Sequence, residues 1–310
     1  IMITTVTLNA AIDKTYALPS FQQGKVNRVQ EVYSEPGGKG INVAKVLNTL
    51  QQEVVTTGFV GGFNGKYICA RLDEMGIDHQ FVQVKGESRL CLNVLDENSN
   101  TQTEILEPGP AIHRVAWERL KERVADLAAI SEIVVFSGSL PKGLSDDAYA
   151  QLIEIAHHHK AKPIVDTSGI ALSLGLPKKP FMVKPNRDEL AALLKTESLH
   201  EREIVDVMKE WHEDGIALVV VSLGSEGALV SHEGDVYKVT PPSVRAVNPV
   251  GSGDALVAGM AAGIVSGFSI EETLILATAV ATANAMEDRA GCIDLDKVKR
   301  FKKAVHIKRI

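Results

Sequence analysis

Short β-branched runs alternate with helical patterns along most of this chain, and this alternation restricts the fold more than any other feature. The expected strands cover residues 3–8, 54–60, 132–137, 163–166, 181–184 and 217–222. Residues 133–136 and 217–221 are apolar at every position, which suits strands that are covered on both faces. Helical patterns lie between them at 41–50, 114–129, 146–158 and 201–213, and two longer ones follow at 254–266 and 270–286. This order predicts an α/β fold with a mostly parallel sheet and helices on both faces.

Two segments depart from this alternation. Residues 25–34 alternate apolar and polar positions, and residues 90–95 and 101–106 flank the polar turn cluster 96–100 as the strands of a hairpin would. We expect them to form a small antiparallel β lid, made from about 12–35 and 86–107, on a single domain that spans 1–310. No internal repeat or linker-like boundary interrupts the chain.

Charge and cysteine content exclude several classes of protein. The net charge of −6 provides no basic field, so nucleic acid is not an expected partner. Cys69, Cys91 and Cys292 are odd in number and lack C-x-x-C spacing, which argues against a disulfide framework and a structural zinc site. The first residues lack the pattern of a signal peptide, and no apolar run has the length of a membrane span. We therefore expect a cytoplasmic protein without a membrane partner.

A glycine-rich turn near the C-terminus leads directly into a helical pattern. In residues 248–254, NPVGSGD, the residues Gly251, Ser252 and Gly253 allow backbone N–H groups to converge at a helix start, where they form an anion hole. Asp254 would lie beside this hole and could accept a proton from an attacking hydroxyl. The alternative is an ordinary turn with a capping aspartate.

A second glycine cluster lies near the N-terminus. Gly37, Gly38 and Gly40 allow the backbone to approach a ligand closely, Lys39 supplies a cation, and Asn42 can hydrogen-bond a sugar hydroxyl. The alternative is a strand-to-helix turn with a solvated lysine. Neither a Walker A loop nor a dinucleotide fingerprint is present.

Together the two clusters resemble the two signatures of the PfkB family of ribokinase-like kinases, and the resemblance extends over essentially the whole chain. The N-terminal match continues through Gly58, Gly61, Gly62 and Gly65. In the C-terminal signature, Asn-Pro replaces the usual Asp-Thr, as in the phosphofructokinase branch, and Ser252 replaces alanine. The resemblance implies a ribokinase-like fold, ATP as phosphoryl donor, Asp254 as catalytic base and residues 251–253 as the anion hole.

On the sugar side, the family places a substrate-binding aspartate at the position of Asp13. Because Asp13 follows the first expected strand, we expect it to face the crevice at the carboxyl ends of the parallel strands. A turn residue bonded to its own backbone is the alternative. Ser139 lies in a turn that the family holds near the sugar, although an ordinary loop fits it equally well.

On the nucleotide side, Asn186 and Glu189 follow Lys184 at the spacing of the family's magnesium motif, Asn-x-x-Glu. Oxygen ligands three residues apart share a helix face and suit Mg²⁺, while a capping box would use the same two residues, and both roles are compatible. The resemblance places Lys184 and the turn residues Ser222, Gly224 and Gly227 at ATP, and Asn284 on the adenine side. Taken alone, the turn would be a hairpin connection.

The acceptor is expected to be a ketohexose that already carries a phosphate. No aromatic residue lies within the glycine clusters 37–42 and 248–254, whereas Lys39, Arg89 and Arg28 place cations on the sugar side. Together with residues 107–110, EPGP, the N-terminal cluster most resembles bacterial 1-phosphofructokinases and tagatose-6-phosphate kinases. Fructose 1-phosphate is therefore the expected substrate. Tagatose 6-phosphate and fructose 6-phosphate are alternatives, and relatives suggest a homodimer through the lid.

Two other classes of protein use similar folds. A catalytically inactive sugar-phosphate sensor is disfavoured by the presence of Asp254, Asn186 and Glu189. A nicotinamide-dependent oxidoreductase is disfavoured because its fingerprint is missing.

Overall fold

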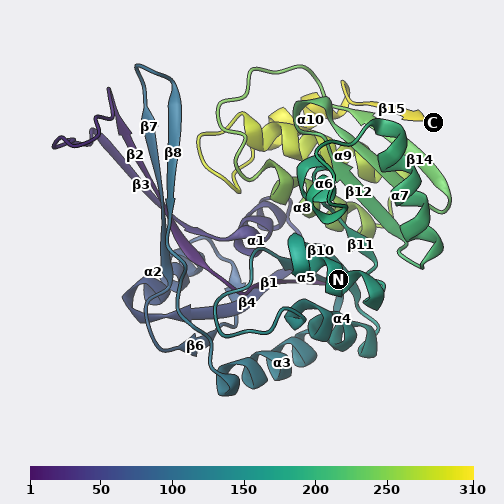
Figure 1. The fold of residues 1–310 in the computed structure, drawn as a ribbon, viewed down its shortest axis with the longest axis horizontal. Coiled ribbons are helices and arrows are strands. Elements are labelled where there is room, and N and C mark those ends of the chain that lie inside the picture. The colour runs from purple at the N-terminus through teal and green to yellow at the C-terminus, as the bar shows by residue number, and fades with distance from the viewer.

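A single twisted sheet runs through the molecule, and a smaller four-stranded sheet projects from one end of it (Figure 1). The computed structural model describes all 310 residues. Its strands are β1 (Met2–Thr7), β2 (Ala11–Leu18), β3 (Glu31–Gly37), β4 (Val54–Gly61), β5 (Asp78–His79), β6 (Val82–Val84), β7 (Arg89–Asp96), β8 (Thr101–Leu106), β9 (Ser131–Ser137), β10 (Lys162–Asp166), β11 (Met182–Val183), β12 (Leu218–Ser222), β13 (Ala228–His232), β14 (Asp235–Thr240) and β15 (His306–Arg309).

The helices alternate with these strands as the sequence predicts. They are α1 (Lys39–Thr49), α2 (Gly62–Glu74), α3 (Arg114–Ala128), α4 (Ala148–His158), α5 (Gly169–Gly175), α6 (Arg187–Leu193), α7 (Glu201–Glu213), α8 (Ser252–Val265), α9 (Ile270–Ala285) and α10 (Leu295–Lys302), with 3₁₀ turns at Leu176–Lys178 and Gly224–Glu226. No helix combines the length and apolarity that crossing a bilayer would require.

The main sheet confirms the expected fold class. Its strand order is β15-β14-β13-β12-β11-β10-β9-β1-β4-β5, and β6 also pairs with β4. The pairings from β12 to β5 are parallel, whereas β13, β14 and β15 add an antiparallel edge. Each of the six strands expected from apolar runs is present, although β11 is shorter than residues 181–184.

Both faces of the main sheet are covered, and successive residues of a strand pack into different cores. In β9, Ile133 and Val135 contribute to the core beneath α1, α2, α8, α9 and α10, whereas Val134 and Phe136 pack against α3, α4, α5, α6 and α7. All four side chains are fully buried. In a strand that is buried on both faces no side chain points to solvent, which explains the continuous apolar runs.

The smaller sheet, called the lid below, has the order β3-β2-β7-β8. Its outer pairings, β2 with β3 and β7 with β8, are antiparallel, while the central pairing of β2 with β7 is parallel. Figure 1 shows the lid standing away from α8 and α9. Sequence reasoning identified the β7–β8 hairpin but not β2 as a separate strand, and residues 25–30 precede β3 rather than belonging to it.

The carboxyl ends of the parallel strands meet at the edge that faces the lid. Asp166 ends β10, Lys184 follows β11 and Ser222 ends β12, so three polar side chains from adjacent strands reach the same edge. In parallel α/β sheets this edge is where ligands bind.

Candidate active site

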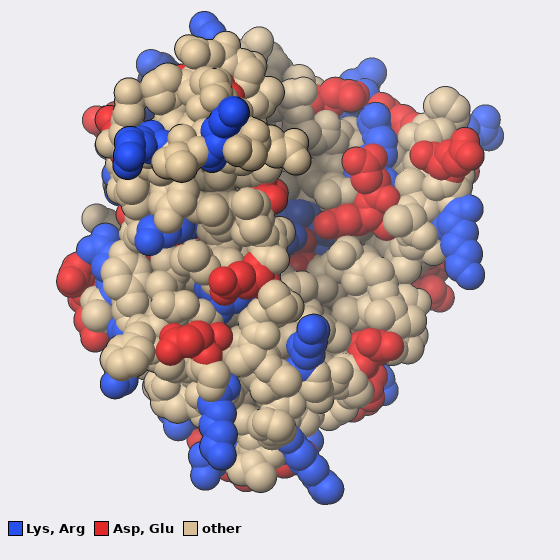
Figure 2. All heavy atoms as spheres, turned by 60° about the vertical axis from the view of Figure 1, so that its left-hand side comes forward, with Lys and Arg blue, Asp and Glu red and all other residues tan.

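A cavity of about 1040 Å³ lies between this edge and the lid. Figure 2 shows the molecule hollowed between two lobes, with acidic side chains gathered along the wall of the hollow. Most residues that the sequence places at a site line the cavity: Asp13, Gly38, Lys39, Asn42, Arg89, Lys184, Asn186, Glu189, Ser222, Gly224, Gly227, Gly251, Ser252, Gly253 and Asp254. Residues distant in sequence therefore come together in one place.

Asp254 lies at the bottom of this cavity, in the first turn of α8. Its side chain is buried, and one carboxylate oxygen accepts a hydrogen bond from the amide Nδ2 of Asn42 at 2.9 Å. Burial raises the pKa of Asp254 to about 6, against the opposing influence of the Lys39 ammonium. A carboxyl group with this pKa is ionised at neutral pH and is a better proton acceptor than an ordinary aspartate.

The turn before Asp254 has the backbone that an anion hole requires. Gly251 caps α8 with φ of 83°, in the left-handed region, and a Cβ at this position would lie 2.8 Å from the Cβ of Ala290. Only glycine fits both conditions. The Ser252 N–H donates to the Pro249 carbonyl at 3.2 Å, whereas the N–H groups of Gly251, Gly253 and Asp254 have no backbone acceptor and are free to hydrogen-bond an anion.

Two lysines near the glycine turn, one on α1 and one after β11, both pair with Asp166. The buried Asp166 carboxylate lies 3.4 Å from the Nζ of Lys39 and 3.3 Å from the Nζ of Lys184. Burial lowers the pKa of Lys39, but the carboxylates of Asp166 and Asp254 outweigh it and raise that pKa to about 12. A Cβ on Gly253 would lie 3.3 Å from the Lys184 Nζ, which places this ammonium beside the glycine turn.

Asp166 is a site residue that sequence reasoning missed. It ends a strand that was identified correctly, and its position at the carboxyl end of a parallel strand was the available signal. Because Asp166 belongs to no motif, the sequence predicts only a strand at this position. The structure gives it a clear role, since it holds two cations at fixed positions.

The lid supplies the other wall of the cavity. Asp13 lines it from the third position of β2, in a strand of the lid, whereas the prediction put this residue directly after the first strand of the main sheet. Burial raises the pKa of Asp13, while the cations of Lys45 and Arg89 lower it. The Nε of Arg89 donates to the carbonyl of Asn9 at 3.1 Å, which orients the guanidinium along this wall.

Asn186 and Glu189 form a complete capping box at the start of α6. The Glu189 N–H donates to the Asn186 Oδ1 at 2.7 Å, and the Asn186 N–H donates to the Glu189 Oε2 at 2.9 Å. Both residues also line the cavity. The Glu189 carboxylate retains a second oxygen, Oε1, that the cap does not use.

Four further residues were expected at the substrates but do not line the cavity. Ser139 is exposed on its turn, Arg28 is exposed on the lid, and Asn284 is fully buried. The amide of Asn284 donates to the Val250 carbonyl at 3.0 Å and accepts from the Gly291 N–H at 2.9 Å. This geometry supports the turn that precedes α8 rather than contacting the cavity. Gly37 also lies outside the lining, directly against the Asp13 carboxylate.

Comparison with known proteins agrees with this arrangement. The family model described as "pfkB family carbohydrate kinase" matches residues 6–294. The chain belongs to this family. Both signature clusters of this pfkB-family kinase lie within the matched region.

Similar proteins include sugar-phosphate kinases. A tagatose-6-phosphate kinase from Staphylococcus epidermidis is 40% identical over 309 residues, which cover 99% of each chain. The structure of phosphofructokinase-2 from Escherichia coli in complex with potassium is 30% identical, with a TM-score of 0.92 over 98% of this chain and 99% of that one. A Thermotoga maritima protein described as a possible 1-phosphofructokinase is 27% identical, with a TM-score of 0.88 over the full length of both chains.

Proposed function

We propose that this pfkB-family kinase transfers the γ-phosphoryl group of ATP to a hydroxyl of a ketohexose phosphate, with Asp254 as general base. The observation that supports this most strongly is the position of Asp254. Its carboxylate lies in the first turn of α8, directly after the glycine turn and opposite two lysines that share the Asp166 carboxylate. A proton acceptor and an anion-binding site thus adjoin each other.

In this reaction the acceptor oxygen forms a bond to the γ-phosphorus while the bond from that phosphorus to the β–γ bridging oxygen breaks. The hydroxyl proton passes to the Asp254 carboxylate, and ADP leaves. The hydrogen bond from Asn42 holds the carboxylate in a fixed orientation toward the cavity. Because phosphoryl transfer depends mainly on positioning and charge stabilisation, a fixed base and fixed cations are what the reaction requires.

Charge on the transferred group would be stabilised from two sides. The N–H groups of Gly251 and Gly253 have no backbone acceptor at the helix start, and the Lys184 ammonium lies beside Gly253. Asp166 keeps Lys184 and Lys39 in place before any substrate binds, so little reorganisation is needed during the reaction. Lys39 stays protonated throughout the physiological pH range.

For the sugar we propose Asp13, Asn42 and Arg89 as ligands. The Asp13 carboxylate accepts hydrogen bonds from hydroxyl groups, and Arg89 offers its two terminal NH₂ groups to the phosphate. The fork of an arginine matches phosphate oxygens well. An anion needs such compensation here, because the same wall also carries Glu35 and Glu104.

For the nucleotide we propose Lys184, Ser222, Gly224 and Gly227, all of which line the cavity beside the capping box. The box suits Mg²⁺ bound to the phosphates, since Mg²⁺ favours one or two protein oxygens and keeps several waters. Asn186 and the free Oε1 of Glu189 would hold the ion, directly or through water. Magnesium would neutralise charge on the phosphates of the bound nucleotide.

Tagatose 6-phosphate is the acceptor we place first, because proteins with 40% and 39% identity over nearly the whole chain are tagatose-6-phosphate kinases. Fructose 1-phosphate, which the glycine cluster and residues 107–110 favour, is placed second. Each acceptor is a ketohexose with one phosphate, so the cations of the cavity suit both.

Steady-state kcat/KM for tagatose 6-phosphate, fructose 1-phosphate and fructose 6-phosphate tests this proposal. We expect one of the first two to exceed fructose 6-phosphate by at least about tenfold, a difference of 1.4 kcal/mol in transition-state binding. ATP-dependent turnover of none of them would contradict the proposed function and favour a sugar-phosphate sensor.

A further inference from the structure

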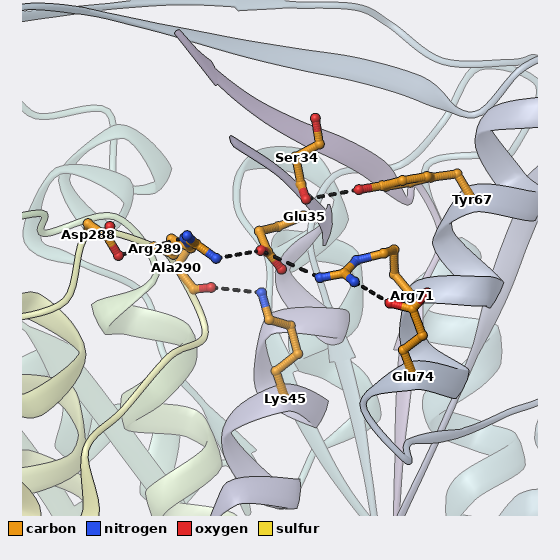
Figure 3. A network of polar contacts seen from close by, with 9 residues as sticks. All are labelled: Ser34, Glu35, Lys45, Tyr67, Arg71, Glu74, Asp288, Arg289 and Ala290. Carbon is orange, nitrogen blue, oxygen red and sulfur yellow. Dashed lines mark hydrogen bonds and ion pairs between the residues drawn. The ribbon is translucent and has the colours of Figure 1, made fainter. Parts of the chain in front are cut away.

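The loop between α9 and α10 contacts the lid through one arginine. The Arg289 Nη1 lies 3.0 Å from the Glu35 Oε1 on β3 (Figure 3). The guanidinium also lies 4.8 Å from the centre of the Tyr33 ring. The Glu35 side chain is only 12% exposed. Both residues line the cavity, but neither belongs to the two glycine clusters.

The residue after Arg289 in this loop, Ala290, contacts the 251–253 turn. The Cβ that Gly251 lacks would lie 2.8 Å from the Ala290 Cβ, so these two backbones are in direct contact. The Nζ of Lys45 on α1 donates to the Ala290 carbonyl at 2.9 Å, and Asn284 bonds both Gly291 and Val250. The loop therefore lies between the lid and the glycine turn and is bonded to rigid helices around it.

Glu35 is also connected to the sugar-binding wall. In the β2–β3 pairing Glu35 is directly opposite Asp13, so these two side chains move together with the lid. From the other side Arg71 of α2 approaches the Glu35 carboxylate at 3.9 Å, and the Tyr67 hydroxyl donates to the Ser34 carbonyl at 2.9 Å. The pair thus sits at the base of the lid, where rotation of the lid would shift Glu35 relative to Arg289.

We propose that Arg289 is a positioning residue for phosphoryl transfer: its ion pair with Glu35 couples the position of the lid over the sugar to the backbone of the 251–253 turn. The inference rests on the proposed kinase reaction, in which Asp13 binds the sugar and the turn binds the transferred group. Sugar binding then fixes the position of Glu35 on the lid, and the ion pair fixes the position of Arg289. The backbone of Ala290, the next residue, supports Gly251.

A double-mutant cycle tests this coupling. Glu35→Gln and Arg289→Met each remove the ion pair while keeping most of the side-chain volume. With saturating ATP and tagatose 6-phosphate or fructose 1-phosphate, whichever turns over faster, we expect each variant to lower kcat roughly 5- to 50-fold, as typical coupling energies allow. The double variant should lose no more than the worse single variant, because both changes break the same link.

Two further measurements separate positioning from general damage. ATP affinity without sugar should stay within about twofold in each variant, since neither Glu35 nor Arg289 is among the residues proposed to bind the nucleotide. Arg289→Lys should recover much of kcat because it keeps the charge. The control is Lys162→Met, which breaks the 3.0 Å pair with Glu132. This pair lies at the amino ends of β9 and β10, away from the cavity. We expect the kcat of this variant to be unchanged.

Losses that multiply in the double variant would mean that Glu35 and Arg289 act independently, and would overturn the proposed coupling. Unchanged kcat in Arg289→Met, or an equal loss in Lys162→Met, would overturn it as well. If the wild-type protein still phosphorylates a sugar phosphate, such a result contradicts only the role of Arg289 and leaves the proposed function in place. A wild-type protein that phosphorylates no sugar phosphate removes both this inference and the function it rests on.

Discussion

At the scale of single residues, the chemistry depends on how four charged side chains at the cavity compensate one another. Asp166 holds Lys39 and Lys184, and Lys39 in turn opposes the effect of burial on Asp254. Sequence reasoning found Lys39, Lys184 and Asp254 because they lie in recognisable motifs. It missed Asp166 because an isolated aspartate at the end of a strand has no local signal, and only the sheet brings it to the lysines.

The raised pKa of Asp254 predicts how activity depends on pH. The base acts in its ionised form, so kcat/KM should fall about tenfold per pH unit below a pKa of about 6, where an ordinary aspartate would stay ionised. Because the Lys39 ammonium lowers this pKa, Lys39→Met should move the acid limb of a pH–rate profile to higher pH. If the acid limb does not move, it reflects titration of the substrate phosphate instead of Asp254, because the second pKa of a phosphate is also near 6.

Arg89 is expected to read the phosphate of the acceptor. A charge-assisted hydrogen bond contributes about 1.5–3 kcal/mol, so Arg89→Ala should lower kcat/KM for the phosphorylated sugar roughly 10- to 150-fold. Its Nε bond to the Asn9 carbonyl supports the lid, so fructose, which lacks the phosphate, serves as the reference substrate. Arg28→Ala is the matched variant, because Arg28 is exposed on the lid outside the cavity. Equal losses on both sugars would assign Arg89 a purely structural role.

At the scale of elements, the site is built where strands end and helices begin. The motifs predicted the starts of α1, α6 and α8 within a few residues, because glycine turns and capping boxes are local signals. They did not predict β2, since its partners β3 and β7 are separated from it in sequence and its middle positions are only half-buried. The sequence therefore predicts Asp13 directly after the first strand, whereas it reaches the cavity from β2.

The capping box of α6 is expected to have a second role at magnesium. Glu189→Gln keeps the shape of the cap, and we expect it to raise the Mg²⁺ concentration for half-maximal rate while costing at most about 1 kcal/mol of stability. Glu272→Gln in the capping box of α9 is the matched control, because that box lies outside the cavity. If both variants lose stability equally and neither changes the Mg²⁺ dependence, Glu189 acts only as a cap.

At the scale of the whole molecule, the lid leaves apolar surface uncovered. Val32 on β3 and Ile105 on β8 are 53% and 54% exposed, and their positions in the strand pairings place them on the same face of the lid. Apolar side chains on an open sheet commonly mark an association surface. The sequence predicted a lid from its hairpin, but it could not show which residues remain exposed, because that depends on the packing of all four strands.

We therefore expect a homodimer through the lid. Light scattering should give twice the chain mass of 33.4 kDa, and Ile105→Lys should shift the mass toward that of one chain. Ile130→Lys is the control, because Ile130 is 63% exposed in the turn before β9, away from the lid. A monomeric wild-type protein, or equal effects of the two lysines, would contradict association through this sheet.

The most direct test of the proposed function is the kcat of Asp254→Asn with saturating ATP, Mg²⁺ and the preferred ketohexose phosphate. The variant keeps the size of the side chain but removes the proton acceptor, so kcat should fall by about 10²–10⁴. ATP affinity and the thermal midpoint should stay close to those of the wild type, which shows that the cavity is intact. A variant that retains kcat within a few-fold of wild type would contradict the assignment of Asp254 as the base.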